Sequence, residues 1–255
     1  MLDQQVRKTV TTTRRVGSSR DRAIRLAHDA LRSSIRRGRL GPDQPLVEFK
    51  LVRTLGIGRN AVREVLRRLA DEGLVIRRPA IGTIIPRPMI RVSPDEIVGF
   101  DGDCEEQFEQ RVTVEVLAQE LIDIAEDLSS SMAIPARMQL VESLIHVDGE
   151  PLALLSQLIP EGYDMARMTN RWEPLDRPFL RLYGVRLGST STTVEAVAAD
   201  AWCATLLGTD EGAPLILREQ VLESEDGSVR MMNFARYRAD RVAFTASSTS
   251  GYEGR

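Results

Sequence analysis

Four polar side chains between residues 59 and 67 have the types and the spacing that contact duplex DNA. On an ideal α-helix they fall within about 100° of one another, and they are Arg59, Asn60, Arg63 and Arg67. Arginine can donate two hydrogen bonds to guanine or bind phosphate, and asparagine can pair with adenine in the same bidentate way. We expect the first three to contact bases or phosphates and the fourth to contact the DNA backbone. Taken alone, a basic helix face is equally consistent with a surface that is merely exposed to solvent. The neighbouring elements therefore decide whether the helix is predicted to bind DNA.

The other positions of this segment form an apolar stripe that predicts how the helix is anchored. They cover the opposite side of the same helix and are Ala61, Val62, Val65, Leu66 and Leu69. We expect the helix to run from Arg59 to Glu72 and to be closed by Gly73. Its first turn would also offer backbone N–H groups to a phosphate.

A first helix is expected at the start of the patterned sequence. Ser18 and Asp21 fit a capping box, although Ser19 could serve as the cap instead. Gly38 ends the run. The inward positions recur at helical spacing and are Ile24, Ala27, Leu31 and Ile35.

The elements around the basic helix complete the arrangement of a winged helix-turn-helix over residues 18–87. A short helix is expected at about Leu46–Leu55, and a tight turn at Gly56-Ile57-Gly58 joins it to the basic helix. Two β-like runs follow, at Leu74–Arg78 and Thr83–Pro86. The inward side chains of the short helix are expected to be Leu51, Val52 and Leu55.

Charge is divided unevenly along the 255 residues, although the formal net charge is only −3. Residues 1–91 contain 21 Lys and Arg against 8 Asp and Glu, a net of +13, and the rest contains 13 against 29, a net of −16. This split favours a basic nucleic-acid module joined to an acidic body. Residues 1–17 are polar and lack periodicity, so we expect a flexible basic arm, either merely disordered or in contact with DNA.

Composition disfavours several classes of protein. No apolar run approaches the roughly 20 residues that cross a bilayer, and the N-terminal segment lacks the apolar region of a secretory signal. Two cysteines, Cys104 and Cys203, cannot by themselves form a disulfide framework or a zinc site.

Residues 58–75, GRNAVREVLRRLADEGLV, resemble the DNA-binding domain of the GntR family of bacterial transcription regulators. The resemblance extends over residues 22–85 and implies a winged helix-turn-helix in a bacterial, cytoplasmic, nucleoid-associated protein. By position it places Arg59 and Arg63 on the family's DNA-contacting arginines, and it places Asn60 and Ala61 on its usual pair of threonines.

Several positions depart from the family's usual pattern. The usual Ser and Arg of the second helix are Val47 and Phe49, and the usual Gly and Arg of the wing tip are Ala80 and Ile81. The family's wing residues Gly82 and Thr83 are kept, and Arg77 and Arg78 remain to bind the DNA backbone. The loss of two positive charges predicts a salt dependence of DNA binding that is shallower by roughly two units.

The acidic part of the chain is expected to form a mixed α and β domain over residues 110–247. A linker at 88–109 precedes it and a disordered tail at 248–255 follows it. Turns at Asp148-Gly149 and Asp226-Gly227 predict two β-hairpins, one joining 134–147 to 151–160 and one joining 214–224 to 228–244. Further strands are expected at 112–121 and within 191–200, the latter leading into a helix.

Four segments in this region resemble the UTRA ligand-sensing domain, which marks the HutC subfamily of GntR regulators. They are VDGEPLALLSQLIP (147–160), residues 182–200, residues 206–227 and YRADRVAF (237–244). The resemblance implies an α+β protein whose second domain is an antiparallel sheet flanked by helices, similar to chorismate lyase. It also implies a dimer, and a small effector that binds between sheet and helices and changes the spacing of the two DNA-binding domains.

Subfamily members that sense phosphorylated sugars usually carry charged side chains at four pocket positions. Here those positions hold Ser143, Ile145, Leu155 and Met231, and we expect them, with Tyr237, to line the effector pocket. Because each charge-assisted hydrogen bond to a phosphate contributes about 1.5–3 kcal/mol, we expect a neutral or apolar effector, or none. The alternative is that these side chains fill a core and the domain only dimerises.

No catalytic, metal-binding or cofactor-binding constellation can be named. His28 and His146 have no ligand partners at metal-binding spacing, and no GxSxG, P-loop or GxGxxG motif is present. The leading hypothesis is a homodimeric repressor without enzymatic activity that binds an inverted-repeat DNA operator and is released by a small effector. Two alternatives stay open: a ligand-independent repressor, for example of plasmid replication or transfer, and an enzyme on a chorismate-lyase-like scaffold.

Overall fold

A computed structural model describes residues 18–42, 45–87, 89–94, 112–163 and 176–246. The chain divides into two compact units, Met1–Pro88 and Met89–Arg255. The expected arm at 1–17, most of the expected linker, the tail at 248–255 and Cys104 lie outside the described residues.

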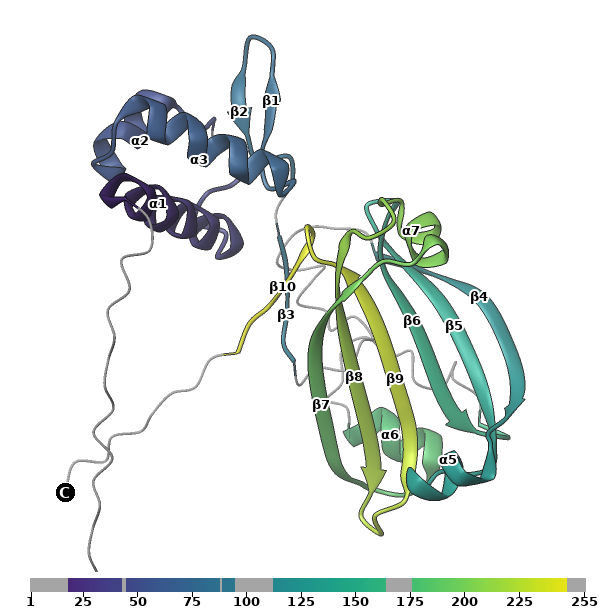
Figure 1. The fold of residues 1–255 in the computed structure, drawn as a ribbon. Helices are drawn as coiled ribbons and strands as arrows, with labels where there is room; N and C mark the ends of the chain where they lie inside the picture. Colours follow the sequence, from purple (N-terminus) through teal and green to yellow (C-terminus); the bar gives the residue numbers. More distant parts are fainter. Residues whose placement is uncertain (1–17, 43–44, 88, 95–111, 164–175, 247–255) are drawn as a thin grey trace, which may run out of the picture. The chain divides into compact units, whose positions relative to one another are not determined.

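The described residues of the first unit form three helices, and the bounds of these helices agree with the predicted ones to within two residues. They are α1 (Ser19–Arg36), α2 (Glu48–Leu55) and α3 (Arg59–Asp71) (Figure 1). The predicted capping box is confirmed, because the Asp21 amide donates to Ser18 Oγ at 3.2 Å and the Ser18 amide donates to the Asp21 carboxylate at 2.9 Å. The four predicted inward residues of α1 are all buried.

A tight turn and a β-hairpin complete the first unit. Gly56 ends α2 with a φ of +64°, a conformation that favours glycine. After α3, β1 (Ile76–Arg78) and β2 (Gly82–Ile84) pair antiparallel to form the wing. The Leu46 amide donates to the Thr83 carbonyl at 2.7 Å, which ties the chain before α2 to the wing. The winged helix-turn-helix is thus confirmed.

A six-stranded antiparallel sheet forms the body of the second unit, in the order β4-β5-β6-β9-β8-β7 (Figure 1). Its strands are β4 (Val112–Asp123), β5 (Arg137–Val147), β6 (Glu150–Pro160), β7 (Leu187–Ala198), β8 (Pro214–Ser224) and β9 (Val229–Arg238). The first predicted hairpin is confirmed as the β5–β6 pair. The second is confirmed as the β8–β9 pair up to Arg238, whereas residues 242–244, which were expected to belong to it, form a separate strand.

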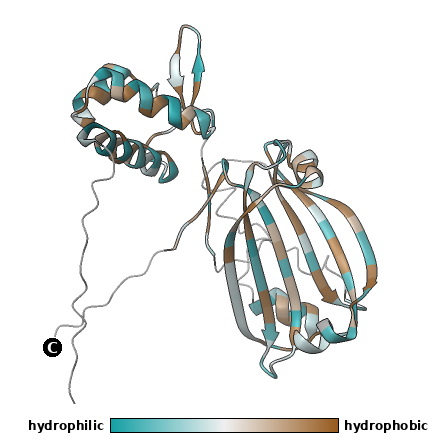
Figure 2. Ribbon diagram, viewed as in Figure 1, coloured by the Kyte–Doolittle hydropathy of each residue, from teal (hydrophilic) through white to brown (hydrophobic). Residues whose placement is uncertain are grey.

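Among the described residues two short helices pack on the faces of the sheet, and hydrophobic and polar residues alternate along its strands (Figure 2). Helix α7 (Ala201–Leu207) packs on the face that carries Leu144, Leu154 and Leu215. Helix α6 (Asp176–Tyr183) packs on the opposite face, against Ile159, Leu222 and Met231. Helix α5 (Glu126–Ser131) precedes β5.

The segment expected to be a linker contains a strand of the second unit. Residues Ile90–Val92 form β3, which pairs in parallel with β10 (Val242–Phe244). Ile90 is 1% exposed and packs with Val242 against the sheet. The compact unit that contains the sheet therefore also includes the start of the expected linker, because Ile90–Val92 are held by a strand about 150 residues later in the chain.

Candidate functional site

Helix α3 separates the predicted DNA-contacting side chains from the core. Its apolar stripe is fully buried, with Val62, Val65 and Leu69 at 0% exposure. The opposite side is open, since the side chains of Arg59, Arg63 and Arg67 are 56–70% exposed. Asn60 is exposed as well. The structure therefore brings the four predicted polar contacts to one accessible face of a firmly anchored helix.

Glu48, at the first position of α2, holds two of these arginines together. Its carboxylate accepts hydrogen bonds from Arg59 Nε at 3.2 Å and from Arg63 Nε at 3.1 Å. Partial burial acts to raise the pKa of Glu48, but the hydrogen bonds and charges of the two arginines outweigh it and lower that pKa below its usual value. Glu48 is therefore ionised at neutral pH and fixes the spacing of both guanidinium groups.

Sequence reasoning missed Glu48. It lies 11 residues before Arg59 and 15 before Arg63, and no periodicity links positions on two different helices. The contact follows only from the α2–α3 turn, which sets the two helices against each other.

Arg67 differs from the other two because it is tied within its own helix. It contacts Glu64 at 2.9 Å and Asp71 at 2.7 Å. Hydrogen bonds from Arg67 and Arg68 lower the pKa of Glu64 to about 2. Any DNA group that binds Arg67 would have to compete with these two carboxylates, so a backbone contact of Arg67 stays a prediction.

The N-terminus of α3 lies beside the exposed arginines. Its cap residue is Gly58, and no side chain caps this end of the helix. The amides of Ala61 and Val62 bond to the Gly58 carbonyl at 2.9 and 3.1 Å. No capping side chain therefore competes with an anion for the first amides of the helix, and the phosphate contact stays a prediction.

The wing presents its two arginines on opposite sides. Arg77 and Arg78 are both exposed and adjacent in β1, so their side chains point to opposite faces of the hairpin. Arg77 pairs with Thr83 across the wing, whereas Arg78 pairs with Gly82. Only one of these two pairs can face a given DNA surface.

Three further positions correct or add to the predicted interface. Ala61, placed there by family position, is 7% exposed and belongs to the core of the unit, so its side chain is not available to DNA. At the wing tip Ala80 adopts a φ of +65°, the conformation for which the family's usual glycine is suited. Ile81 beside it is 56% exposed.

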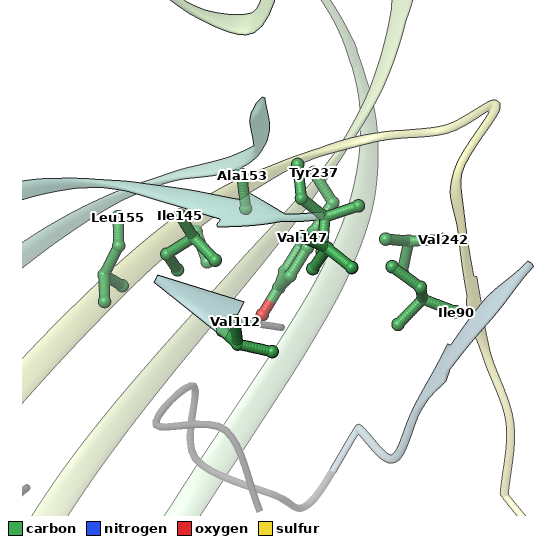
Figure 3. Packing of buried hydrophobic residues seen from close by; sticks show 10 residues of the cluster. Ile90, Val112, Ile145, Val147, Ala153, Leu155, Tyr237 and Val242 are labelled. Atoms are coloured by element: carbon green, nitrogen blue, oxygen red, sulfur yellow. The ribbon is translucent and has the colours of Figure 1, made fainter. Parts of the chain in front are cut away.

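The five predicted effector-pocket positions lie on one face of the sheet but do not meet at one point. Ser143 and Leu155 are cross-strand partners, and Ile145 and Tyr237 occupy the next row. Met231 is six residues from Tyr237 along β9, which is about 20 Å in an extended strand. Ile145, Leu155 and Tyr237 share one apolar cluster (Figure 3), while Met231 belongs to the cluster under α6.

A buried arginine lies on the same face and was missed by sequence reasoning. Arg218 in β8 is 0% exposed and is the largest fully buried side chain in the described residues. It pairs across the sheet with Ala235, which pairs in turn with Leu155. The expectation of a neutral or apolar effector rested on the four replaced positions and took no account of this charge. A signal was present, since Arg218 and Gln220 interrupt the apolar alternation of residues 214–224.

The described histidine and cysteine side chains, for which the sequence predicted no functional role, do not form a second site. His28 contacts Glu72 at 2.7 Å and thereby joins α1 to the end of α3. Burial, and next the contact with Asp200, raise the pKa of Cys203 to about 11, so this thiol is protonated at neutral pH. The described residues contain no cluster of three His, Cys, Asp or Glu side chains suited to a metal ion, and none of their helices is long and apolar enough to span a membrane.

Comparisons with known protein families match both units. The model described as bacterial regulatory proteins, gntR family, matches residues 25–85, and the UTRA domain model matches residues 109–243.

Individual relatives extend over most of the chain. The HTH-type transcriptional repressor NagR of Bacillus subtilis is 25% identical over 222 residues, which cover 85% of this chain and 90% of the repressor. The HTH-type transcriptional repressor PhnF of Mycolicibacterium smegmatis is 26% identical over 230 residues, which cover 87% and 92%. The crystal structure of PhnF from Mycobacterium smegmatis superposes with a TM-score of 0.58 at 24% identity, covering 88% of this chain and 99% of that one, and so shares its fold.

Proposed function

The chain belongs to the GntR family of bacterial regulatory proteins and carries the family's UTRA domain, and on this premise we propose that it is a repressor that binds an inverted-repeat operator as a homodimer. Its relatives NagR and PhnF are both transcriptional repressors. It would act on nucleoid DNA in the cytoplasm.

The exposed face of α3 is the observation that carries this proposal. Arg59 and Arg63 project from a helix whose other side is buried, and Glu48 fixes both side chains at the same time. A guanidinium held in this way can approach guanine with little further loss of side-chain entropy, and each bidentate pair contributes about 1–3 kcal/mol of discrimination. The uncapped end of α3 adds a site for a backbone phosphate.

The charge division supports the assignment of roles to the two units. Residues 1–91 carry a net charge of +13 and are attracted to DNA, whereas the rest carries −16 and is repelled by it. The acidic sheet unit is therefore not expected to bind DNA, and we assign to it dimerisation and the binding of a small effector. Two copies related by a two-fold axis would place two α3 helices on two half-sites of a symmetric operator.

Release from the operator would follow from a small effector bound to the sheet face that carries Ser143, Ile145, Leu155 and Tyr237. An effector changes DNA affinity only if it binds the two conformations of the dimer differently. The proposal is therefore that the effector-bound dimer holds its two winged domains at a spacing that does not match the operator.

Capture of genomic fragments by the purified full-length protein, followed by sequencing and footprinting, tests the proposal. We expect the captured fragments to share an inverted repeat, with protection of two half-sites about one helical turn apart. Protection of a single half-site by a monomer would contradict the dimeric mode. Equal capture of all fragments would contradict sequence-specific repression altogether.

A further inference from the structure

Four large apolar side chains among the described residues of the first unit are exposed to solvent. They are Leu26 on α1, Val47 and Phe49 at the start of α2, and Ile81 at the wing tip. Phe49 is the largest of the four and is 67% exposed, and Val47, which precedes α2, is exposed as well. Single exposed apolar side chains are common on proteins, so the place of Phe49 in the fold decides what it can contact.

Glu48 relates the position of Phe49 to the arginines that are expected to contact DNA. The Glu48 carboxylate accepts hydrogen bonds from Arg59 Nε at 3.2 Å and from Arg63 Nε at 3.1 Å, so the first turn of α2 lies beside the exposed arginines of α3. Phe49 is the next residue of α2. The structure therefore places an exposed aromatic ring directly after the residue that holds both arginines.

The helical turn of α2 directs Phe49 outward on the same side as Glu48. Leu51 is the buried residue of α2 and marks the direction of the core. On an ideal helix Glu48 lies about 60° around the axis from Leu51, and Phe49 lies about 100° beyond Glu48 in the same sense. The ring therefore lies farther from the core than the Glu48 carboxylate. A surface that binds Arg59 and Arg63 from outside can contact the ring at the same time.

The chemistry of a phenyl ring selects one group among those that duplex DNA presents. The ring has no hydrogen-bond donor for a phosphate, and the negative face of its π-system repels an anion. Of the base edges in the major groove, only that of thymine carries an apolar group, the C5-methyl, and apolar side chains such as Phe contact it. A ring beside two arginines that reach the base edges is therefore suited to a thymine methyl group.

We propose that Phe49 contacts the C5-methyl group of a thymine in each half of the operator, next to the bases that Arg59 and Arg63 contact. The inference rests on the proposed function, because it adds a base-specific contact to the same surface. Charge complementarity supports this occupant, since the exposed Lys50 and Arg53 lie on the same short helix and attract the phosphate backbone around the base. Burial of one methyl group raises affinity about fourfold, and therefore about fifteenfold for the two half-sites of a dimer.

Operator duplexes in which deoxyuridine replaces thymine isolate this contact, because the replacement removes the methyl group and keeps the base pair. Each thymine of the captured operator is replaced in turn, together with its symmetry mate in the other half-site, and the affinity of the full-length protein is measured by fluorescence anisotropy. We expect the affinity of the wild type to fall about fifteenfold for at least one symmetric pair of positions. A wild type that binds every substituted operator as tightly as the original would overturn the proposal.

Matched variants assign the effect of the methyl group to one side chain. Phe49→Ala is expected to bind the thymine operator about fifteenfold less tightly than the wild type and to bind the thymine and deoxyuridine operators equally. Phe49→Leu, which keeps an apolar side chain, is expected to retain part of the preference for thymine. Ile81→Ala removes an exposed apolar side chain from the wing and is the control, which should retain the whole preference. A Phe49→Ala protein with the wild-type preference, or an equal loss in Ile81→Ala, would overturn the proposal.

A scrambled duplex in the same titrations distinguishes failure of this contact from failure of the proposed function. If the wild type prefers the operator over the scrambled duplex but does not respond to deoxyuridine, only the methyl contact fails. If the wild type binds the operator and the scrambled duplex equally, the proposed function is contradicted, and the methyl contact that rests on it is contradicted as well.

Discussion

At the level of single residues, the proposed DNA-binding mode gives Glu48 two opposing effects. It fixes Arg59 and Arg63, which favours a sequence-specific fit, but it also places a negative charge on a surface that approaches phosphates. The first effect is specific to the operator, whereas the second weakens binding to every duplex. In the proposed mode of DNA binding, Glu48 would therefore act as a positioning residue that lowers general affinity and raises discrimination.

Substitution of Glu48→Gln should separate these two effects. We expect binding to random duplex to strengthen about threefold and the preference for operator over random duplex to fall about tenfold, because the lost orientation weakens bidentate contacts that contribute about 1–3 kcal/mol each. Mobility shifts with both duplexes give the ratio. Asp71→Asn, which removes the same charge from the end of α3, is the control and should leave the preference intact. A preference unchanged in Glu48→Gln would show that Glu48 does not position the arginines.

The predictability of single residues from sequence depends on whether their role lies within one element. The exposed and buried faces of α3 follow from helical periodicity alone, and the structure agrees with them, including at Ala61, which periodicity placed in the buried stripe although its family position had also suggested a DNA contact. Glu48 and Arg218 could not be assigned in this way. Their contacts join elements that only the tertiary fold brings together, so neither spacing nor residue type predicts them.

At the level of elements, the wing turn carries a local strain. Ala80 adopts a φ of +65°, which costs a residue with a Cβ roughly 1–2 kcal/mol relative to glycine. The strained turn is retained where the family usually has glycine, and it presents the exposed side chain of Ile81.

Ala80→Gly should therefore stabilise the first unit. We expect a net gain of roughly 0.5–1 kcal/mol, because relief of the strain is partly offset by the greater entropy of glycine in the unfolded chain. Ala70→Gly at an exposed position within α3 is the matched control and should destabilise by about 1 kcal/mol. Calorimetric unfolding of the wild type and the two variants measures both changes in the free energy of unfolding. If Ala80→Gly and Ala70→Gly changed the free energy of unfolding in the same direction, the assignment of strain to Ala80 would be contradicted.

The β8–β9 turn is held by one carboxylate. Hydrogen bonds from Ser224 Oγ at 2.6 Å and from the Ser228 amide at 2.9 Å lower the pKa of Asp226 to about 2. Since the folded pKa lies below the ordinary value of 3.8, the ionised group stabilises the folded state above about pH 4. That contribution is lost as the pH falls from about 4 to about 2.

Asp226→Asn makes this pH dependence measurable. The difference in urea midpoint between the wild type and the variant should be constant from pH 7 to pH 5, shrink below pH 4 and vanish near pH 2. Both tryptophans, Trp172 and Trp202, lie in the second unit, so their fluorescence follows its unfolding. A difference that persists unchanged at pH 2.5 would show that the ionised carboxylate does not stabilise the turn.

The elements themselves were largely predictable because each has a local signal. Capping residues, helical periodicity, glycine turns and Asp-Gly hairpins gave the helices of the first unit and the hairpins of the second. Strand β3 was missed because its three residues carry no strand pattern of their own and are held only by pairing with Val242–Phe244. The segment RPMIRVSPDE has two prolines and one short apolar stretch, which is typical of a linker.

At the level of the whole molecule, the division of charge assigns DNA to one unit and keeps it from the other. Two family positions that are usually positive are apolar here, at Phe49 and Ile81, and both side chains are more than half exposed. The operator affinity of this protein should therefore depend less on salt than that of a relative with both charges. We expect this salt dependence to be set by the basic unit alone.

A double variant that restores both charges, Phe49→Arg and Ile81→Arg, tests this weak salt dependence of operator affinity. We expect the slope of log affinity against log salt to steepen by up to about two units, because each phosphate contact contributes about 0.9. Mobility shifts at four sodium chloride concentrations give the slope. Trp202→Arg, at a 51% exposed position in the acidic unit, adds a charge away from the expected interface and should leave the slope unchanged. Equal slopes in the double variant and the wild type would place these two positions outside the interface.

The most direct test of the account compares the wild type with the Arg59→Ala/Arg63→Ala double variant on the captured operator and on a scrambled duplex. Arg68→Ala, on the same helix but away from the exposed arginine face, serves as control. We predict that the double variant binds both duplexes with the same weak affinity, a loss of at least a hundredfold on the operator, while the control keeps its preference. A double variant that still prefers the operator as strongly as the wild type would show that α3 does not read the DNA sequence.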